Sequence, residues 1–242
     1  MSREFLVVIP ARYKSSRFPG KPLIDINGKS MIRRVWEKSV EASSSENVII
    51  ATDDKRIEEH CLENGMQTIM TSKDCLTGTD RVAEVAKKID ADFYINVQGD
   101  EPLINPRDIE EVIRAFKENP ICTYCAMSKA DLNDDYNNHN IPKVVTANDG
   151  SLLYISRAGI PANKEGSSVP IMKQVCIYAF PKNHLDKFGL GKDKTKLESL
   201  EDIELLRLIE LGCKVKMLEL NTNSIAIDTP EDLRKVLKIL NN

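Results

Sequence analysis

Short apolar runs rich in β-branched residues alternate with segments of helical periodicity through the first half of the chain. The apolar runs predict strands that are buried on both faces, and they lie at residues 5–9, 47–52, 67–70 and 93–97. The helical segments follow them in turn, at residues 31–40, 53–64, 79–89 and 105–117. Because this alternation is typical of βαβ units, we expect an α/β fold with a mostly parallel, doubly wound sheet.

The pattern changes after residue 120, where strand-like runs are separated by polar loops. These runs lie at residues 143–146, 152–156 and 174–179. We therefore expect a smaller β-rich subdomain at about residues 121–180, within a single domain that spans residues 1–242. Beyond it we expect a long helix at residues 200–211 and two strands at residues 214–220 and 225–227. We expect a last helix after Asp228.

Charge and hydropathy exclude two classes of protein. The chain has 34 basic and 37 acidic residues, a net charge of −3, so we expect no nucleic-acid partner. Its apolar runs are far shorter than the roughly 18 residues that span a bilayer. We therefore expect no membrane insertion and a cytoplasmic location. The six cysteines include one isolated Cys-x-x-Cys at Cys122 and Cys125, which we interpret as reduced core thiols rather than a zinc site.

Basic side chains cluster in the connection after the first predicted strand. Residues 12–34 hold seven basic side chains and one acidic side chain. Doubly wound sheets bind ligands at the carboxyl ends of their strands, so Arg12, Arg17 and Lys21 are placed to clamp a polyphosphate. The stiff Pro-Gly-Lys-Pro run favours a fixed geometry over a solvated loop. The connection matches neither a Walker loop nor GxGxxG, which excludes P-loop kinases and dinucleotide-dependent dehydrogenases.

Acidic residues stand at two further strand ends. Asp100 follows the predicted strand at 93–97, and Asp228 lies at a later strand-to-helix junction. Each carboxylate could form a turn or cap a helix, whereas together they could hold one Mg²⁺ facing the polyphosphate. Gln98 could read a polar edge of a substrate, the helix start at residues 77–81 could bind an anion, and Arg157 could hold a carboxylate.

Several motifs together resemble one family. Residues 9–23, Ile-Pro-Ala-Arg-Tyr-Lys-Ser-Ser-Arg-Phe-Pro-Gly-Lys-Pro-Leu, resemble the signature of the CMP-Kdo synthetases, which activate 3-deoxy-D-manno-octulosonic acid (Kdo). Further matching segments follow in the family's order, at residues 51–54, 70–72, 77–81, 96–102, 154–157, 177–178 and 228–233. Any one motif alone would be weak, but this ordered set covers nearly the whole chain.

The resemblance implies a fold, a reaction and a set of partners. The fold is that of the nucleotide-diphospho-sugar transferases, with a β-rich subdomain that binds the acidic sugar and supports a homodimer. The reaction is CTP + Kdo → CMP-Kdo + pyrophosphate, it uses Mg²⁺, and it serves lipopolysaccharide or capsule synthesis. The preference for cytosine follows from the resemblance and not from the chemistry of the residues.

The resemblance also implies three groups of site residues. The catalytic group is Arg12, Lys21, Asp100 and Asp228, of which Asp100 and Asp228 hold the Mg²⁺. The nucleotide contacts are Ala11, Arg12, Arg17, Lys21, Thr71, Ser72, Gly78, Gln98 and Asp100. The sugar contacts are Arg81, Gln98, Arg157, Gln174, Tyr178 and Glu204.

One segment departs from the family pattern. Gln174 stands where the family generally has a histidine that contacts the sugar, and Cys176 replaces a glycine. A glutamine side chain cannot become cationic, which leaves open Kdo, its 8-amino analogue and other 2-keto-3-deoxy acids as the substrate. A cytidylyltransferase for sialic-type nonulosonic acids and a non-catalytic nucleotide-binding paralogue are the alternatives. The intact set of basic and acidic residues argues against the paralogue.

Overall fold

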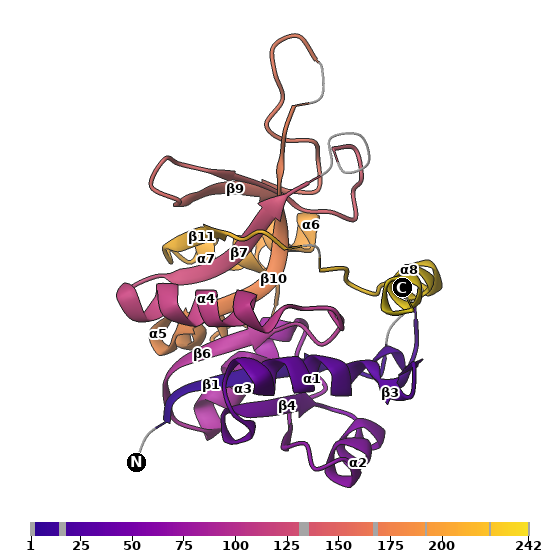
Figure 1. Ribbon diagram of the computed structural model, residues 1–242. Coiled ribbons are helices and arrows are strands. Elements are labelled where there is room, and N and C mark those ends of the chain that lie inside the picture. The colour runs from indigo at the N-terminus through magenta and orange to yellow at the C-terminus, as the bar shows by residue number, and fades with distance from the viewer. Residues whose placement is uncertain are drawn as a thin grey trace.

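A mixed sheet forms the centre of the molecule in this computed structural model (Figure 1), which describes residues 3–14, 18–130, 136–166, 169–191, 193–222 and 224–241. The main path of the sheet runs in the order β11-β7-β10-β6-β1-β4-β5. Its strands are β1 (Arg3–Ala11), β4 (Val48–Thr52), β5 (Thr68–Met70), β6 (Ala91–Val97), β7 (Thr123–Lys129), β10 (Met172–Pro181) and β11 (Val215–Glu219). Four of the six pairings along this path are parallel, which confirms the predicted α/β class.

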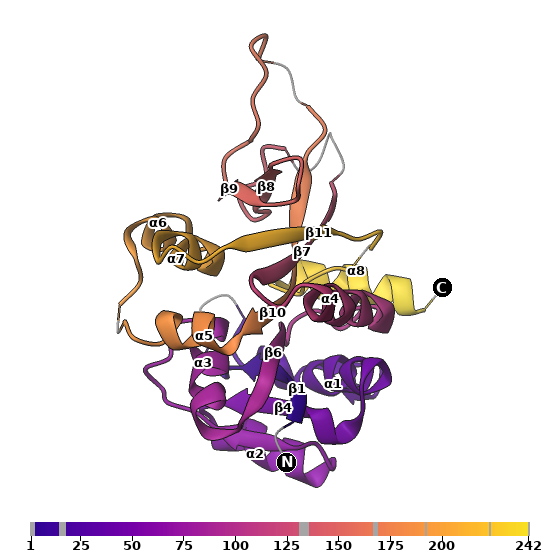
Figure 2. The ribbon, with the colours of Figure 1, turned by 90° about the vertical axis from the view of Figure 1, so that its left-hand side faces the viewer.

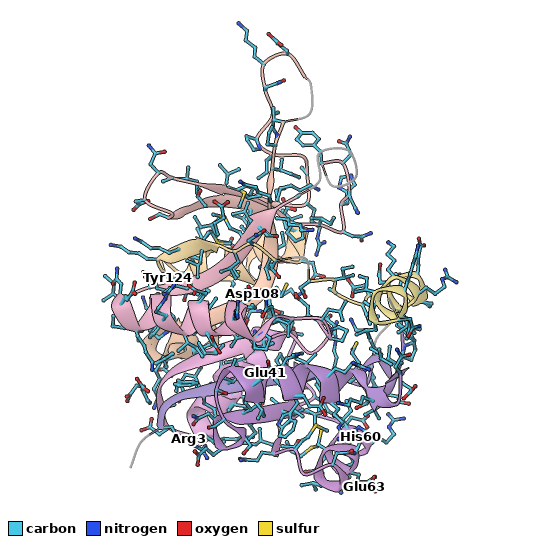
Figure 3. The ribbon with its side chains drawn as sticks, in the orientation of Figure 1. Arg3, Glu41, His60, Glu63, Asp108 and Tyr124 are labelled. Atoms are coloured by element: carbon cyan, nitrogen blue, oxygen red, sulfur yellow. The ribbon has the colours of Figure 1, made fainter. Side chains whose placement is uncertain are left out.

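Helices cover both faces of the sheet. On one face lie α1 (Met31–Ala42), α2 (Lys55–Glu63) and α4 (Pro106–Glu118), and Figure 3 shows His60 on α2 and Asp108 on α4 from this side. On the other lie α3 (Gly78–Lys88), α5 (Lys182–Phe188) and α7 (Glu204–Glu210), as Figure 2 shows. In β1, Leu6 and Val8 pack toward α3, while Val7 and Ile9 pack toward α1. Burial on both faces explains why the strands are continuous apolar runs and not alternating ones.

The antiparallel strand β10 joins the parallel part of the sheet to an extension. One edge of β10 pairs with β7 along most of its length, from Met172 to Ala179. Its second half also pairs with β6, and its first two residues pair with β8 (Lys143–Thr146). Strand β9 (Leu152–Ser156) then pairs with β8. Within residues 121–180, β7 and most of β10 therefore lie on the main path of the sheet. Strands β8 and β9 form the extension off this path, at the upper end of the molecule in Figure 1.

A third, smaller core ties the end of the chain to its beginning. Ile26 and Met31 pack against Ile227 and Val236, and all four are fully buried. They come from β2 (Asp25–Ile26), the start of α1, the segment before α8, and α8 itself (Pro230–Leu240). β2 pairs with β3 (Lys29–Ser30), and short 3₁₀ turns lie at Lys21–Leu23 and Ser45–Asn47. This core brings the segment before α8 next to the connection that follows β1.

Two sequence-based predictions of secondary structure were wrong. The predicted helix at residues 200–211 is two helices, α6 (Lys196–Glu201) and α7, because Asp202 adopts a left-handed conformation with φ 52° and ψ 47°. Arg157 donates to the carbonyls of Glu201 and Asp202, which satisfies acceptors that a continuous helix would use.

The predicted strand at residues 225–227 is also absent. The segment crosses the carboxyl ends of the strands instead, with the Ile227 N–H donating to the Asp100 carbonyl at 2.8 Å. Ile225 and Ile227 are apolar because they pack in the small third core. Separately, no helix in the described part of the chain is long and apolar enough to cross a membrane.

Candidate active site

The carboxyl ends of β1 and β6 open onto a cavity of about 600 Å³. Its walls combine four parts of the chain: the connection after β1, the start of α3, the residues after β6, and the α6–α7 region. Of the predicted site residues, the cavity is lined by Ala11, Arg12, Lys21, Gly78, Arg81, Gln98, Asp100, Arg157, Glu204 and Asp228. Arg17 lies outside the described residues. Tertiary folding therefore brings together residues that are more than 200 positions apart in sequence.

Lys21 lies between the two predicted metal carboxylates. Its Nζ is 2.8 Å from Oδ2 of Asp100 and 3.1 Å from Oδ1 of Asp228. The Lys21 side chain is 14% exposed, against 29% for Asp100 and 37% for Asp228. Burial on its own lowers the pKa of Lys21, but the charges and hydrogen bonds of Asp100 and Asp228 outweigh burial and raise this pKa above its usual value. The ammonium is therefore cationic at neutral pH.

Neighbouring residues cap the helices that follow the two carboxylates. Thr229 caps α8 in a capping box with Asp232, and Asn105 caps α4. Neither Asp100 nor Asp228 is used as a helix cap. Both residues line the cavity. Two carboxylates on one side of a cavity suit Mg²⁺, which in proteins commonly binds one or two carboxylates together with water and substrate phosphates. The described residues contain no group of three or more His, Cys, Asp or Glu side chains able to form an all-protein metal cage.

The start of α3 does not offer the free anion site that we expected from residues 77–81. The carboxylate of Glu204 accepts the N–H groups of Gly78 and Thr79, each at 3.0 Å, and also the Thr79 hydroxyl. Burial raises the pKa of Glu204, although these hydrogen bonds oppose the rise. An internal carboxylate thus occupies the positive end of α3. Thr77 and Asp80 complete a capping box there.

Gly78 lies close to the side-chain amide of Gln98. A Cβ at position 78 would lie 2.8 Å from Nε2 of Gln98 and 3.1 Å from its Oε1. Gln98 is fixed from the other side, where its N–H donates to the Cys176 carbonyl at 3.3 Å. The backbone of Gln98 is therefore tied to β10, and its side chain lies close to the start of α3, at the wall of the cavity.

Arg81 is bound internally by three groups. It forms an ion pair with Asp53 at 3.0 Å, and Nη1 donates to Oγ1 of Thr71 at 2.7 Å and to the Ser72 carbonyl at 3.1 Å. Thr71 and Ser72 do not line the cavity, although we predicted them as nucleotide contacts. In this structure they support Arg81, which does line it. Asp53 is not among the residues that we predicted for the site. It stands directly after β4, and this position at a strand end could have indicated it.

Arg157 ties the extension of the sheet to the break between α6 and α7. Its guanidinium donates to the carbonyls of His139, Glu201 and Asp202. The backbone N–H of Arg157 donates to the Glu201 carboxylate at 2.9 Å. Ser156 donates to the same carboxylate at 2.7 Å. This side chain therefore holds one wall of the cavity in place, a role that sequence alone did not indicate.

Gln174 and Tyr178 lie behind the cavity wall. Neither lines the cavity, and Nε2 of Gln174 donates to the Tyr178 hydroxyl at 2.9 Å. The pairing of β10 with β7 shifts register between Val175 and Tyr178, so Cys176 lies in an irregular stretch of the strand. There its N–H donates to the Glu101 carboxylate at 3.3 Å. Burial raises the pKa of Glu101 to about 7, and the adjacent charge of Asp100 adds to this rise.

A buried ionic network that sequence analysis missed joins α3, α6 and α7. Arg207, which is 2% exposed, donates to both carboxylate oxygens of Glu198 at 2.5 and 2.7 Å and to Asp80 at 2.6 Å. Its guanidinium also lies 3.9 Å from the centre of the Phe188 ring. Because α7 carries Glu204, this network holds Glu204 against α3. Other cavity residues that sequence analysis missed are His139, Asn140, Lys194, Glu198 and Asp202.

Known proteins resemble this chain in sequence and in fold. The profile of one family, described as cytidylyltransferase, matches residues 6–217. The chain belongs to the cytidylyltransferase family. Its nucleotidyltransferase class, which we expected from the motifs, is thereby confirmed.

Relatives of this cytidylyltransferase match almost end to end. The 3-deoxy-manno-octulosonate cytidylyltransferase of Syntrophotalea carbinolica is 42% identical over 239 residues, with 95% of each chain covered. The 8-amino-3,8-dideoxy-manno-octulosonate cytidylyltransferase of Shewanella oneidensis is 41% identical over 241 residues, with the same coverage. A solved structure of CMP:2-keto-3-deoxy-manno-octonic acid synthetase complexed with CTP superposes with a TM-score of 0.90 at 36% identity, covering 98% of each chain.

Proposed function

We propose that this cytidylyltransferase transfers the CMP group of CTP to an acidic 2-keto-3-deoxy sugar of the Kdo type and releases pyrophosphate. The observation that carries the proposal is the meeting of Lys21 with Asp100 and Asp228 at the cavity, which Arg12 also lines. The product would supply lipopolysaccharide or capsule synthesis. The names of the relatives, which include both Kdo and 8-amino-Kdo enzymes, support this substrate class.

The proposed reaction is an in-line displacement at phosphorus. The anomeric hydroxyl of the sugar attacks the α-phosphate, a new C–O–P linkage forms, and the bond from the α-phosphorus to the β-phosphate oxygen breaks. The attacking sugar carries a carboxylate and the triphosphate is anionic, so charge repulsion forms a large part of the barrier. Arg12, Arg17 and Lys21 are the cationic groups that offset it and stabilise the departing pyrophosphate.

Asp100 and Asp228 are the proposed ligands of Mg²⁺. When bound there, the ion would neutralise charge on the phosphate oxygens and orient the α-phosphate. Before substrate binds, the Lys21 ammonium keeps the two carboxylates close together despite their mutual repulsion. The charge of Lys21 is therefore positioned at the place where the triphosphate is proposed to bind.

The nucleotide and the sugar are proposed to bind next to each other in the cavity, because Glu204 of the sugar group accepts the N–H of Gly78 of the nucleotide group at 3.0 Å. The nucleotide group would involve Ala11, Gly78 and Gln98, with Thr71 and Ser72 acting through Arg81. The sugar group would involve Arg157 and Glu204, with Gln174 and Tyr178 supporting the wall. A neutral glutamine at position 174 supports a sugar whose recognition does not depend on a cationic side chain there.

The experiment that tests this function is a pyrophosphate-release screen of the purified protein. CTP and UTP would each be paired with Kdo, 8-amino-Kdo and sialic acids, with and without Mg²⁺. We expect Mg²⁺-dependent release with CTP and one of the two octulosonic acids. Turnover with sialic acids alone would favour the nonulosonic-acid alternative, and CTP binding without turnover of any sugar would favour the non-catalytic paralogue.

We further propose that residues 121–180 contribute a subdomain that forms a homodimer. Support comes from exposed leucines near the extension: Leu153 on β9 is 60% exposed, and Leu200 on α6 is 74% exposed. Light scattering coupled to size-exclusion chromatography would measure the mass. We expect a dimer that Leu153→Glu weakens, whereas a wild-type monomer at micromolar concentration would contradict the proposal.

A further inference from the structure

Tyr13 lies in the connection that carries Lys21, and its ring stacks with Arg56 of α2. The guanidinium carbon of Arg56 lies 3.3 Å from the centre of the Tyr13 ring. Neither residue lines the cavity, so neither is placed to touch a substrate held there. The pair therefore calls for an explanation other than direct binding.

Arg56 is itself held in one orientation. Its Nε donates to Oδ1 of Asp54 at 2.8 Å, and Nη2 donates to Oδ2 at 2.7 Å. Asp54 is in turn the N-cap of α2 and accepts the Arg56 N–H at 3.0 Å. A two-pronged pair of this kind fixes the plane of a guanidinium, which lets it stack flat on an aromatic ring. The start of α2 thus offers a rigid cationic surface to Tyr13.

Tyr13 passes this restraint on to the residue before Lys21. Its carbonyl accepts the Gly20 N–H at 3.0 Å, which closes the connection at its base. The ring of Tyr13 also packs on Gly20. A Cβ atom at position 20 would lie 3.2 Å from both Cζ and the hydroxyl oxygen of Tyr13. Gly20 has φ +72°, so a side chain at this position would be strained as well as crowded. Lys21 follows immediately, in the 3₁₀ turn.

We propose that Tyr13 and Arg56 are positioning residues that set the place of Lys21 between Asp100 and Asp228. This inference rests on the proposed function, in which the Lys21 ammonium meets the triphosphate. Lysine has a long flexible side chain, so the position of its backbone decides where its charge can act. Displacement of a reacting-site group by about 1 Å can cost as much as a hundredfold in rate, so a restraint remote from the chemistry can matter.

The test is steady-state kinetics of Arg56→Ala and Tyr13→Leu at saturating Mg²⁺. Each variant is expected to lower kcat/KM for CTP by about tenfold while changing KM for the acidic sugar less than about twofold. Tyr13→Phe keeps the ring and should rescue most of the loss seen with leucine. Arg114→Ala is the matched control, because Arg114 is an exposed arginine on α4 that pairs with Glu111 of the same helix. Melting temperatures of all the variants should agree with the wild type.

A double variant tests whether the two residues act as one unit. Arg56→Ala combined with Tyr13→Leu should lose about as much as the worse single variant, and losses that multiply would overturn the proposal. Single-variant values equal to those of Arg114→Ala, or equal losses for CTP and sugar accompanied by a lower melting temperature, would also overturn it. An inactive wild-type protein would instead overturn the proposed function, so the two failures are distinguishable.

Discussion

At the scale of single residues, the site is organised by one lysine and two aspartates from distant parts of the chain. Asp100 follows β6, Asp228 precedes α8, and Lys21 begins the 3₁₀ turn after β1. The short contacts of the two carboxylates with the ammonium raise the pKa of Lys21 and so stabilise its positive charge. Removal of one carboxylate leaves the lysine paired with the other, so the fold should tolerate the change better than the chemistry does.

We expect Asp100→Asn to lower kcat by more than about a hundredfold, because an amide is a poor ligand for Mg²⁺ and carries no charge. Initial rates of pyrophosphate release across a Mg²⁺ titration would measure this. Asp92→Asn, an exposed change at the other end of β6, serves as the control and should keep its activity. Unchanged turnover in Asp100→Asn would contradict the metal assignment, provided that circular dichroism shows a native fold.

Glu101 predicts a pH dependence of stability. Its pKa is raised from 4.5 to about 7 by burial, so between these values the folded state binds more protons than the unfolded state. The contribution of Glu101 is thus most favourable below about pH 4.5, declines as the pH rises to 7, and stays constant above that. Glu101→Gln, which remains neutral, should exceed the wild type in unfolding free energy by a small margin near pH 5 and by a larger margin near pH 8.

Urea unfolding of Glu101→Gln and of the wild type at several pH values measures this difference. The expected gain at pH 8 is about 3 kcal/mol. A glutamine oxygen can still accept the Cys176 N–H, which limits other losses. A constant difference between the two proteins from pH 5 to pH 8 would show that Glu101 does not titrate in this range.

At the scale of elements, the break between α6 and α7 is the feature that shapes one side of the cavity. The break lets Glu204 reach the start of α3, and it frees two carbonyls that Arg157 binds from the extension of the sheet. Arg207 holds the broken pair of helices against α3 through Glu198 and Asp80. Three elements are therefore joined by one buried guanidinium.

Arg207→Met should destabilise the protein by about 3–5 kcal/mol, because it leaves the buried Glu198 carboxylate without its partner. The measurement is the free energy of unfolding in urea. Arg207→Met combined with Glu198→Leu removes both buried charges and should recover a large part of the loss. A double variant as unstable as the single variant would mean that side-chain packing, and not the unpaired charge, is responsible.

At the scale of the whole molecule, the small third core determines whether the site is complete. It fixes α8 against the residues after β1 and thereby brings Asp228 to Lys21. The core contains few buried side chains, so this end of the chain should open more readily than the central sheet. If Asp228 and Asp100 bind the cation together, opening of this end of the chain would take Asp228 away from the cation and lower the activity.

Val236→Ala probes this dependence, since Val236 is fully buried on α8. The lost packing should weaken the third core by about 1–2 kcal/mol. We expect faster amide hydrogen exchange in residues 225–241, a severalfold higher Mg²⁺ requirement, and little change in the central strands. Ile239→Ala is the control, because Ile239 lies on the same helix and is 49% exposed. Equal exchange in the two variants would contradict the proposed coupling.

The α/β class, the order of most strands and helices, and the family could all be predicted from the amino-acid sequence. Local periodicity predicts these elements because burial on two faces or on one helix face leaves a direct imprint on neighbouring residues. It failed at residues 200–211, where Arg157, from a distant strand, competes for the helix carbonyls. It failed again at 225–227, where an apolar run serves a small core and not a strand.

Which site residues meet, and what each one contacts, depends on long-range packing and could not be predicted from the sequence. Lys21, Asp100 and Asp228 meet because strand ends converge and α8 packs back on α1, which no local pattern encodes. Glu204 and Arg157, which we predict as sugar contacts, both line the cavity; Glu204 also accepts N–H groups at the start of α3, and Arg157 also holds the cavity wall. Hydrogen-bond partners depend on distances across the fold, so residue type indicates what a side chain can do, while packing decides what it does.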